Sequence, residues 1–167
     1  VSFEVVSSNA DEEAAKQRFR ELGLGPAVLA DALAEAKALG VGADALILGC
    51  DQTLERADGG SSGKPASRTE AKRQLEALSG TSHRLHSAAV IVEAGAPVWR
   101  CTESVTLRMR PLSQAFLESY LDAEYDAIRH GVGGYRIEGP GVQLFDRIEG
   151  CHFAIPGLPP VPLLASL

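Results

Sequence analysis

The stretch from Leu46 to Pro65, LILGCDQTLERADGGSSGKP, holds the residues whose types and spacing could do chemistry. Asp51 follows an apolar run, and Lys64 comes thirteen residues later. In α/β sheets ligands gather beyond the carboxyl ends of the strands, so a carboxylate at such a place can bind a ligand or accept a proton. A turn or helix-capping role for Asp51 stays open, because aspartate is common in both.

Lys64 lies in the segment GGSSGKP, which superficially resembles a phosphate-binding P-loop. That loop needs a glycine where this sequence has Asp58, and a Ser or Thr where it has Pro65. The segment is therefore not a Walker motif. By itself it predicts a turn whose lysine is either solvated or close to an anionic ligand.

Two predicted helices precede Asp51 and carry further charged residues. The first covers residues 10–23, with acids such as Glu12 in its first turn, basic residues further on and a glycine at its end. The second covers residues 26–40 and has an apolar stripe on one face, with Lys37 among its other positions. The helix dipole alone would explain Glu12, and Lys37 could be an ordinary exposed lysine.

Short strands and a long hairpin are predicted beside these helices. Residues 1–6 alternate like a strand, and residues 43–49, ADALILG, form an apolar run too short for a core helix. The latter predicts a buried strand with Asp51 just beyond its carboxyl end. Residues 83–110 have a period of two on both sides of Ala94-Gly95-Ala96-Pro97, which predicts two strands joined in a hairpin.

The remaining elements complete a predicted α/β fold. A capping box opens a helix over residues 67–78, and Pro111 and Ser113 introduce another. The glycine-rich residues 130–141 allow close approach of the backbone to a ligand, and a helix ends the chain. This order predicts one α/β domain over residues 1–167, with a mixed, twisted sheet and helices on its faces.

The composition narrows the class of protein. A chain of 167 residues, 45% of them hydrophobic, fits one domain with a sizeable core. The net charge of -6 argues against nucleic acid as a partner, because its phosphates would be repelled. No apolar run approaches the roughly 18 residues of a membrane span and no secretory signal heads the sequence, so we expect a cytoplasmic protein that does not bind membranes. The three widely spaced cysteines are expected to be reduced.

A series of short motifs resembles the Maf family of nucleotide pyrophosphatases, the septum-formation-inhibitor proteins of bacteria. The resemblance covers nearly the whole chain and preserves the order of the motifs. They read FEVV, ADE, LAEAKA, GCDQ, GKP, LSGTSH, RPLS, YRIEGPG, FDRIEG and GLP. It implies a Maf/ITPase-like fold and hydrolysis of a nucleoside triphosphate between its α and β phosphates, with Mg²⁺ or Mn²⁺ as cofactor.

The resemblance also implies roles for individual residues. Asp51 is the expected proton acceptor that activates water, and Glu12 and Asp51 are the expected metal ligands. This suits magnesium, which prefers one or two carboxylates together with phosphate oxygens and water. Lys64 and Lys37 are expected to bind the substrate, and so is His83 of the LSGTSH motif.

Two further positions bear on which nucleotide is bound. Family members that act on dTTP and UTP typically carry D-T and I-Q-G where this chain has D-Q and I-E-G, at Gln52 and Glu138. The two residues look like those of the branch that acts on 7-methyl-GTP. A carboxylate can accept hydrogen bonds from the N1–H and 2-amino edge of guanine. An ordinary surface pair of Glu138 with Arg136 or Arg147 is the competing interpretation.

The sequence also departs from the family pattern. It does not contain the S-x-S-P-R-R segment whose serine and arginines are thought to hold the triphosphate, and DAIRHGVGG replaces the usual D-K-A-G stretch. A second hypothesis is therefore a degenerate Maf-like protein that binds a nucleotide or a cell-division partner without turnover. A third is a related pyrophosphatase for inosine or xanthosine triphosphate. A homodimer is expected from the tendency of Maf relatives to pair.

Overall fold

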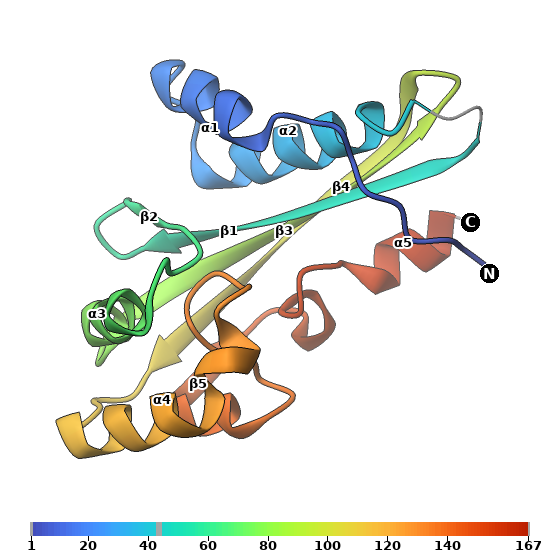
Figure 1. Cartoon of the computed structure of the whole chain (residues 1–167). Coiled ribbons are helices and arrows are strands. Elements are labelled where there is room, and N and C mark those ends of the chain that lie inside the picture. The colour runs from blue at the N-terminus through green and yellow to red at the C-terminus, as the bar shows by residue number, and fades with distance from the viewer. Residues whose placement is uncertain (1, 43–44, 167) are drawn as a thin grey trace.

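A computed structural model describes residues 2–42 and 45–166, and in it helices cover both faces of a twisted five-stranded sheet (Figure 1). The strand order is β2-β1-β3-β4-β5, and the four pairings are all antiparallel. The strands are β1 (Ile47–Arg56), β2 (Ser61–Ser62), β3 (Ser82–Glu93), β4 (Ala96–Met109) and β5 (Phe145–Glu149). The helices are α1 (Glu12–Glu21), α2 (Pro26–Leu39), α3 (Arg68–Leu78), α4 (Gln114–Ile128) and α5 (Pro160–Ser166), with 3-10 turns η1 (Pro140–Leu144) and η2 (His152–Ala154).

The predicted α/β class and the helices on the faces of the sheet are confirmed. The described strands contain no parallel pair, however, so the mixed sheet of the prediction is not what their pairing shows. Alternation of apolar and polar residues reports which side chains share a face, and it carries no information on the direction of the neighbouring strand.

The β3–β4 hairpin is the longest element, and its turn chemistry explains it. Ala94 and Gly95 both have positive φ, 47° and 77°, as a two-residue turn of the primed type requires. The predicted hairpin is therefore confirmed. Both partner strands of the sheet, β1 and β5, pair with its outer edges.

Local capping signals set the helix boundaries as predicted. The Ser67 hydroxyl accepts a hydrogen bond from the backbone N–H of Glu70, and the Ser113 hydroxyl accepts one from Phe116. Each bond satisfies one of the unpaired N–H groups at a helix start. The helices predicted over residues 10–23 and 26–40 are also confirmed, as α1 and α2.

Two hydrophobic clusters fill the two faces of the sheet. On one face small residues of α2 pack against β3, in a cluster of Ala30, Ala34, Ala38, Ala88, Val90 and Val92. On the other, larger side chains from α3, α4, β1, β3 and β4 form the main core, including Leu54, Leu75, Leu85, Leu107, Leu117 and Leu121. The small side chains bring α2 close to the sheet on the first face.

Two strand predictions are corrected. The strand predicted over residues 43–49 runs instead over Ile47–Arg56, so Asp51 lies in its middle rather than beyond its end; residues 43 and 44 lie outside the described residues. Residues 2–6, where the first strand was predicted, form no strand, and Val1 lies outside the described residues. Alternation alone does not make a strand, because the backbone groups also need a partner strand.

Among the described residues, no helix is both long and apolar enough to cross a membrane. The three cysteines, Cys50, Cys101 and Cys151, are free thiols as predicted.

Candidate active site

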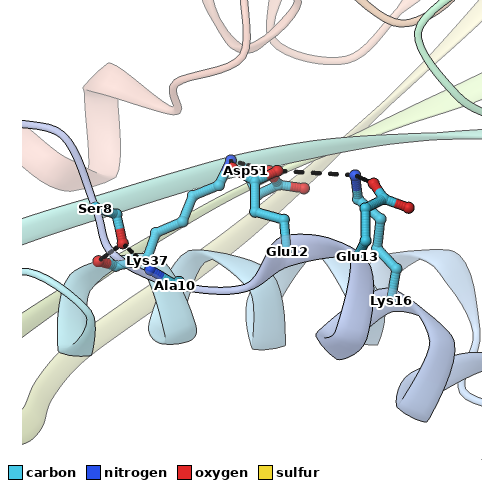
Figure 2. Close-up of polar contacts among 7 residues, drawn as sticks. All are labelled: Ser8, Ala10, Glu12, Glu13, Lys16, Lys37 and Asp51. Carbon is cyan, nitrogen blue, oxygen red and sulfur yellow. Dashed lines mark hydrogen bonds and ion pairs between the residues drawn. The ribbon is translucent and has the colours of Figure 1, made fainter.

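Three charged side chains from three elements meet on one face of the sheet (Figure 2). The ammonium of Lys37 on α2 lies between two carboxylates. Its Nζ is 2.5 Å from Oδ1 of Asp51 on β1 and 3.4 Å from Oε1 of Glu12 on α1. The side chains are partly enclosed, with exposed fractions of 12% for Asp51, 22% for Lys37 and 39% for Glu12. We call these three residues the acidic–lysine group.

Gly49 explains how α2 comes close enough for this contact. A Cβ at Gly49 would lie 2.1 Å from the backbone oxygen of Ala34 and 2.9 Å from Cβ of Ala38. Only glycine fits there without moving the helix. Gly49 lies two residues before Asp51 on the same side of β1, so the close approach brings Lys37 within reach of the carboxylate.

Two hydroxyl groups hold the surrounding elements in register. Thr53 donates a hydrogen bond of 2.7 Å from Oγ1 to the backbone oxygen of Pro26, which ties the start of α2 to β1. Ser8 donates from Oγ to the backbone oxygen of Lys37 at 2.9 Å and accepts from the N–H of Ala10 at 3.1 Å (Figure 2). The segment ahead of α1 is thus fastened to α2, which places Glu12 beside Lys37.

Burial and charge act against each other on Asp51 and Lys37. Burial raises the pKa of Asp51 above its usual value, and the nearby Lys37 ammonium opposes this shift. For Lys37 burial alone would lower the pKa, but the hydrogen bond to Asp51 and the charges of Asp51 and Glu12 together raise it. Lys37 is therefore a firmly protonated cation at neutral pH.

The acidic–lysine group lies at an open edge of the sheet. On one side β1 pairs with β3 along its whole length, whereas on the other it pairs with β2 only at Leu54 and Glu55. Over Ile47–Thr53 this second edge of β1 has no partner strand among the described residues. The backbone of β1 at Asp51 is therefore not covered by a described strand on this side.

The donor set suits a hard divalent cation shared with a substrate. The carboxylates of Glu12 and Asp51 converge on the Lys37 ammonium, whose positive charge offsets part of their negative charge. Within residues 2–42 and 45–166 no cluster of three or more His, Cys, Asp or Glu side chains could hold a metal ion alone. Two carboxylates fit magnesium or manganese when phosphate oxygens and water complete the coordination.

On the opposite face of the sheet, Gln52 and Glu138 line one cavity. Successive residues of a strand point to opposite faces, so Gln52 faces away from Asp51. The cavity holds about 160 Å³ and is lined mainly by apolar residues of α4, the glycine-rich segment and the chain after η2. Gln52 and Glu138 both belong to this lining, so the structure brings the two predicted specificity residues together.

Within the described residues Glu138 forms no hydrogen bond or ion pair with Arg136 or Arg147, although its charge, after that of Glu124, helps to raise the pKa of Arg136. Arg136 donates from Nε to Glu124 at 2.9 Å, and Arg147 pairs with Glu149 at 2.5 Å. Glu138 is exposed and has no hydrogen bond or ion pair with any described residue. Its carboxylate is available to a ligand in the cavity.

Lys64 is exposed in the loop after β2 and has no partner among the described side chains. The pairing of β2 with β1 runs from Ser61 opposite Glu55 to Ser62 opposite Leu54. The chain therefore leaves β2 travelling along β1 in the direction of Asp51, with Lys64 two residues further on. This direction is compatible with the expected contact to phosphate.

His83 belongs neither to the acidic–lysine group nor to the residues that line the cavity. Its side chain is 2% exposed and contacts Tyr135, whose hydroxyl is 2.7 Å from Nε2, and Phe145. Burial lowers the pKa of His83 to about 4, so the ring is neutral at physiological pH. The structure places the predicted substrate ligand in the core, on the face of the sheet opposite Asp51, because the register of β3 points it there.

The sequence reasoning missed several residues that shape the site. Lys16 lies 3.7 Å from Glu12 and 2.8 Å from Glu13, and the spacing of three and four residues on one helix could have indicated both pairs (Figure 2). Ser8 and Thr53 act through bonds to distant backbone, for which the sequence holds no signal.

The fold and the two sites define a class of α/β protein with acidic and basic groups at a sheet edge and an apolar cavity behind them. The chain belongs to the Maf family: the family described as "Maf-like protein" matches residues 1–167. The resemblance found in the short motifs is thereby confirmed.

Relatives of known description match along the whole chain. It is 44% identical over 170 residues to a nucleoside triphosphate pyrophosphatase of Sphingopyxis alaskensis, covering 100% of this chain and 86% of that protein. It is 46% identical over 169 residues to a nucleoside triphosphate pyrophosphatase of Caulobacter vibrioides, with 100% and 84% covered. It is also 40% identical over 170 residues to a 7-methyl-GTP pyrophosphatase of Brucella abortus, with 100% and 85% covered.

Proposed function

We propose that this chain hydrolyses nucleoside triphosphates between the α and β phosphates, giving a nucleoside monophosphate and pyrophosphate, with the acidic–lysine group as its reaction centre. Membership of the Maf family and relatives described as nucleoside triphosphate pyrophosphatases make it an enzyme of that class. The observation that carries the assignment to this group is the position of Lys37 Nζ, between Asp51 and Glu12 at the open edge of β1.

Asp51 is the proposed proton acceptor. Its carboxylate is the most enclosed of the three side chains and is held by Lys37, which leaves its second oxygen able to accept a proton from an attacking water. A general base must be fixed in this way within hydrogen-bond reach of the water.

Glu12 and Asp51 are the proposed ligands of a Mg²⁺ or Mn²⁺ ion. Bound there, the ion would polarise the α-phosphate and neutralise the charge that develops on it. The same carboxylates would otherwise repel a triphosphate.

The lysines supply positive charge for the phosphates. Lys37 is protonated and partly enclosed beside Asp51, where its charge is less screened than on the open surface. Lys64 is free of partners within the described chain, and β2, which precedes it, runs along β1 in the direction of Asp51. Both are proposed to contact phosphate oxygens.

Gln52 and Glu138 are the proposed contacts to the base, with 7-methyl-GTP as the preferred substrate. The shared cavity supports this, and so does the likeness to a protein described as a 7-methyl-GTP pyrophosphatase. Gln52 and Asp51 are neighbours on β1 but face opposite sides of the sheet. Because β1 is an edge strand there, a nucleotide that passes around the edge can reach both faces.

Measurement of pyrophosphate release tests this proposal. The purified chain is incubated with Mg²⁺ or Mn²⁺ and a panel of 7-methyl-GTP, GTP, dTTP, UTP and inosine triphosphate. Asp51→Asn should lower kcat by about 10²- to 10⁴-fold, as removal of a general base does. The control is Asp31→Asn, which changes a carboxylate of α2 that pairs with Arg100 instead.

Turnover that survives Asp51→Asn would refute the assigned reaction centre. Binding of nucleotide without turnover by the unaltered chain would support the degenerate binding protein in place of the enzyme. A cytoplasmic location and a homodimer also remain our proposals, and sedimentation of the purified chain tests the dimer.

A further inference from the structure

We propose that Ser87 is a positioning residue for base recognition: together with the backbone oxygen of Ile155, it holds the side-chain amide of Gln52 so that the carbonyl oxygen, and not the NH₂ group, faces the cavity. The cavity then selects bases with adjacent hydrogen-bond donors, as guanine has. This inference rests on the proposed function for the use of the cavity. It adds a residue that helps to hold the Gln52 amide in this orientation.

The hydrogen bonds around Gln52 permit one orientation of its amide. Nε2 of Gln52 donates to the backbone oxygen of Ile155 at 2.9 Å and to Oγ of Ser87 at 2.8 Å. Ser87 in turn donates its hydroxyl hydrogen to the backbone oxygen of Ala154 at 2.7 Å. A carbonyl oxygen can only accept, so the group facing Ile155 must be the NH₂.

Ser87 adds a second constraint against the reversed amide. Because its single hydrogen is used on Ala154, Ser87 presents only lone pairs to Gln52. An amide turned by 180° would set the carbonyl oxygen of Gln52 against two acceptors. Both hydrogens of the NH₂ group are thus engaged, and the remaining oxygen, Oε1, is left for the cavity.

The residues that anchor Gln52 are buried. Ser87 is 1% exposed in the middle of β3, and its bond partner Ala154 is fully buried at the end of η2. Gln52 and Ser87 are paired residues of neighbouring strands, so their side chains stand side by side on one face. The orientation of Gln52 is therefore set by the core and does not depend on a mobile loop.

Two other polar side chains of the lining, Tyr135 and Arg136, each have a bonded partner. The hydroxyl of Tyr135 is bonded to His83, and Arg136 is bonded to Glu124. Gln52 Oε1 and the carboxylate of Glu138 are the side-chain acceptors of the lining that have no hydrogen-bond partner among the described residues. Guanine offers N1–H and a 2-amino group on one edge, whereas uracil and thymine offer a single N–H between two carbonyls that both acceptors would repel.

The first experiment observes the amide itself by heteronuclear NMR of isotope-labelled protein without nucleotide. Gln52→Ala identifies the Gln52 side-chain signals by their disappearance. In the unaltered protein we expect both NH₂ protons to exchange slowly with solvent, because both are hydrogen-bonded to buried residues. Ser87→Ala should speed their exchange. Rapid exchange in the unaltered protein, or no change in Ser87→Ala, would overturn the proposed anchoring.

The second experiment measures binding of GMP, IMP and UMP by calorimetry. IMP lacks only the 2-amino group of GMP. The unaltered chain should bind GMP more tightly than IMP, and IMP more tightly than UMP. Ser87→Ala should reduce the preference for GMP over UMP by about three- to tenfold, the value of one or two hydrogen bonds. Ser87→Cys, close in size but weak in hydrogen bonding, should do the same and guards against loss of packing.

A matched control is Ser104→Ala, which removes a serine that bonds to His86 on the adjacent strand but faces the other side of the sheet. It should leave the GMP preference unchanged. Equal affinity of the unaltered chain for the three nucleotides, absence of binding at saturating concentrations, or an unchanged preference in Ser87→Ala would refute the inference. A GMP preference in a chain that releases no pyrophosphate would refute the proposed activity and leave this inference standing.

Discussion

Asp51 and Gln52 are neighbours on β1 whose side chains work on opposite faces of the sheet. Asp51 accepts a hydrogen bond of 2.5 Å from Lys37 on α2, whereas Gln52 donates to Ser87 and to the backbone of Ile155. One dipeptide at an edge strand therefore belongs both to the proposed reaction centre and to the proposed base cavity. Separate substitutions can test the two.

Lys37→Met should lower kcat/KM by about 10- to 100-fold and should change the folded structure little. The variant keeps the length of the side chain but removes the charge that the proposed site offers to phosphate. Steady-state kinetics with a nucleoside triphosphate measure the effect. Lys72→Met serves as the control, because Lys72 pairs with Glu118 of α4 and is remote from this group. Equal rates in the two variants would argue against a role for Lys37.

Gly49→Ala should destabilise the chain by about 1–3 kcal/mol, because the added methyl group overlaps Ala34 of α2 and must push the helix away. Urea unfolding measures the free energy. The same substitution at Gly63, where a Cβ would meet nothing within 4 Å and φ is not positive, should cost far less. Similar losses at both positions would show that close helix packing is not the cause.

Glu138→Gln should reduce the preference for 7-methyl-GTP over dTTP and UTP, expressed as relative kcat/KM, by about tenfold. The neutral amide loses the charge-assisted bonds to guanine donors and the attraction to a methylated, positively charged purine. Glu76→Gln changes a surface carboxylate of α3 and should leave the ratios as they are. Unchanged ratios in Glu138→Gln would remove Glu138 from base recognition.

His83 predicts how stability depends on pH. Its pKa is lowered from 6.5 to about 4 by burial, so the unfolded chain binds a proton there at a higher pH than the folded one. The contribution of His83 to the free energy of unfolding should be complete above about pH 6.5. It should fall by up to about 3 kcal/mol as the pH drops to about 4. Chemical denaturation across this range should show a smaller fall in His83→Gln than in His130→Gln. Parallel curves would contradict the assignment.

Helices and the hairpin could be predicted because their signals are local. Ser67 and Ser113 bond to N–H groups three residues away, and the turn at Ala94 and Gly95 needs only two residues with positive φ. The extent of β1 could not be predicted in this way. Its continuation through Asp51 to Arg56 depends on pairing with β3, which lies far along the chain.

The site residues also divide into those that local motifs could indicate and those whose position depends on the fold. The motifs were enough to single out Asp51, Lys37 and Glu12, and the structure brings these together. His83 also belongs to a family motif, yet the register of β3 turns it into the core between Tyr135 and Phe145. A motif records which residue is present, and the pleat of the sheet decides which face it serves.

By itself the sequence determined the family, the class of chemistry, the helix limits and the hairpin, all of which follow from residue types and short spacings. Only the tertiary structure decided that the Lys37 ammonium lies between Glu12 and Asp51, that Gln52 shares a cavity with Glu138, and that the Gln52 amide bonds to Ser87 and to the backbone of Ile155. The physical reason is that these contacts join segments distant in the chain. Strand register and helix packing fix them, and neither is encoded by neighbouring residues alone.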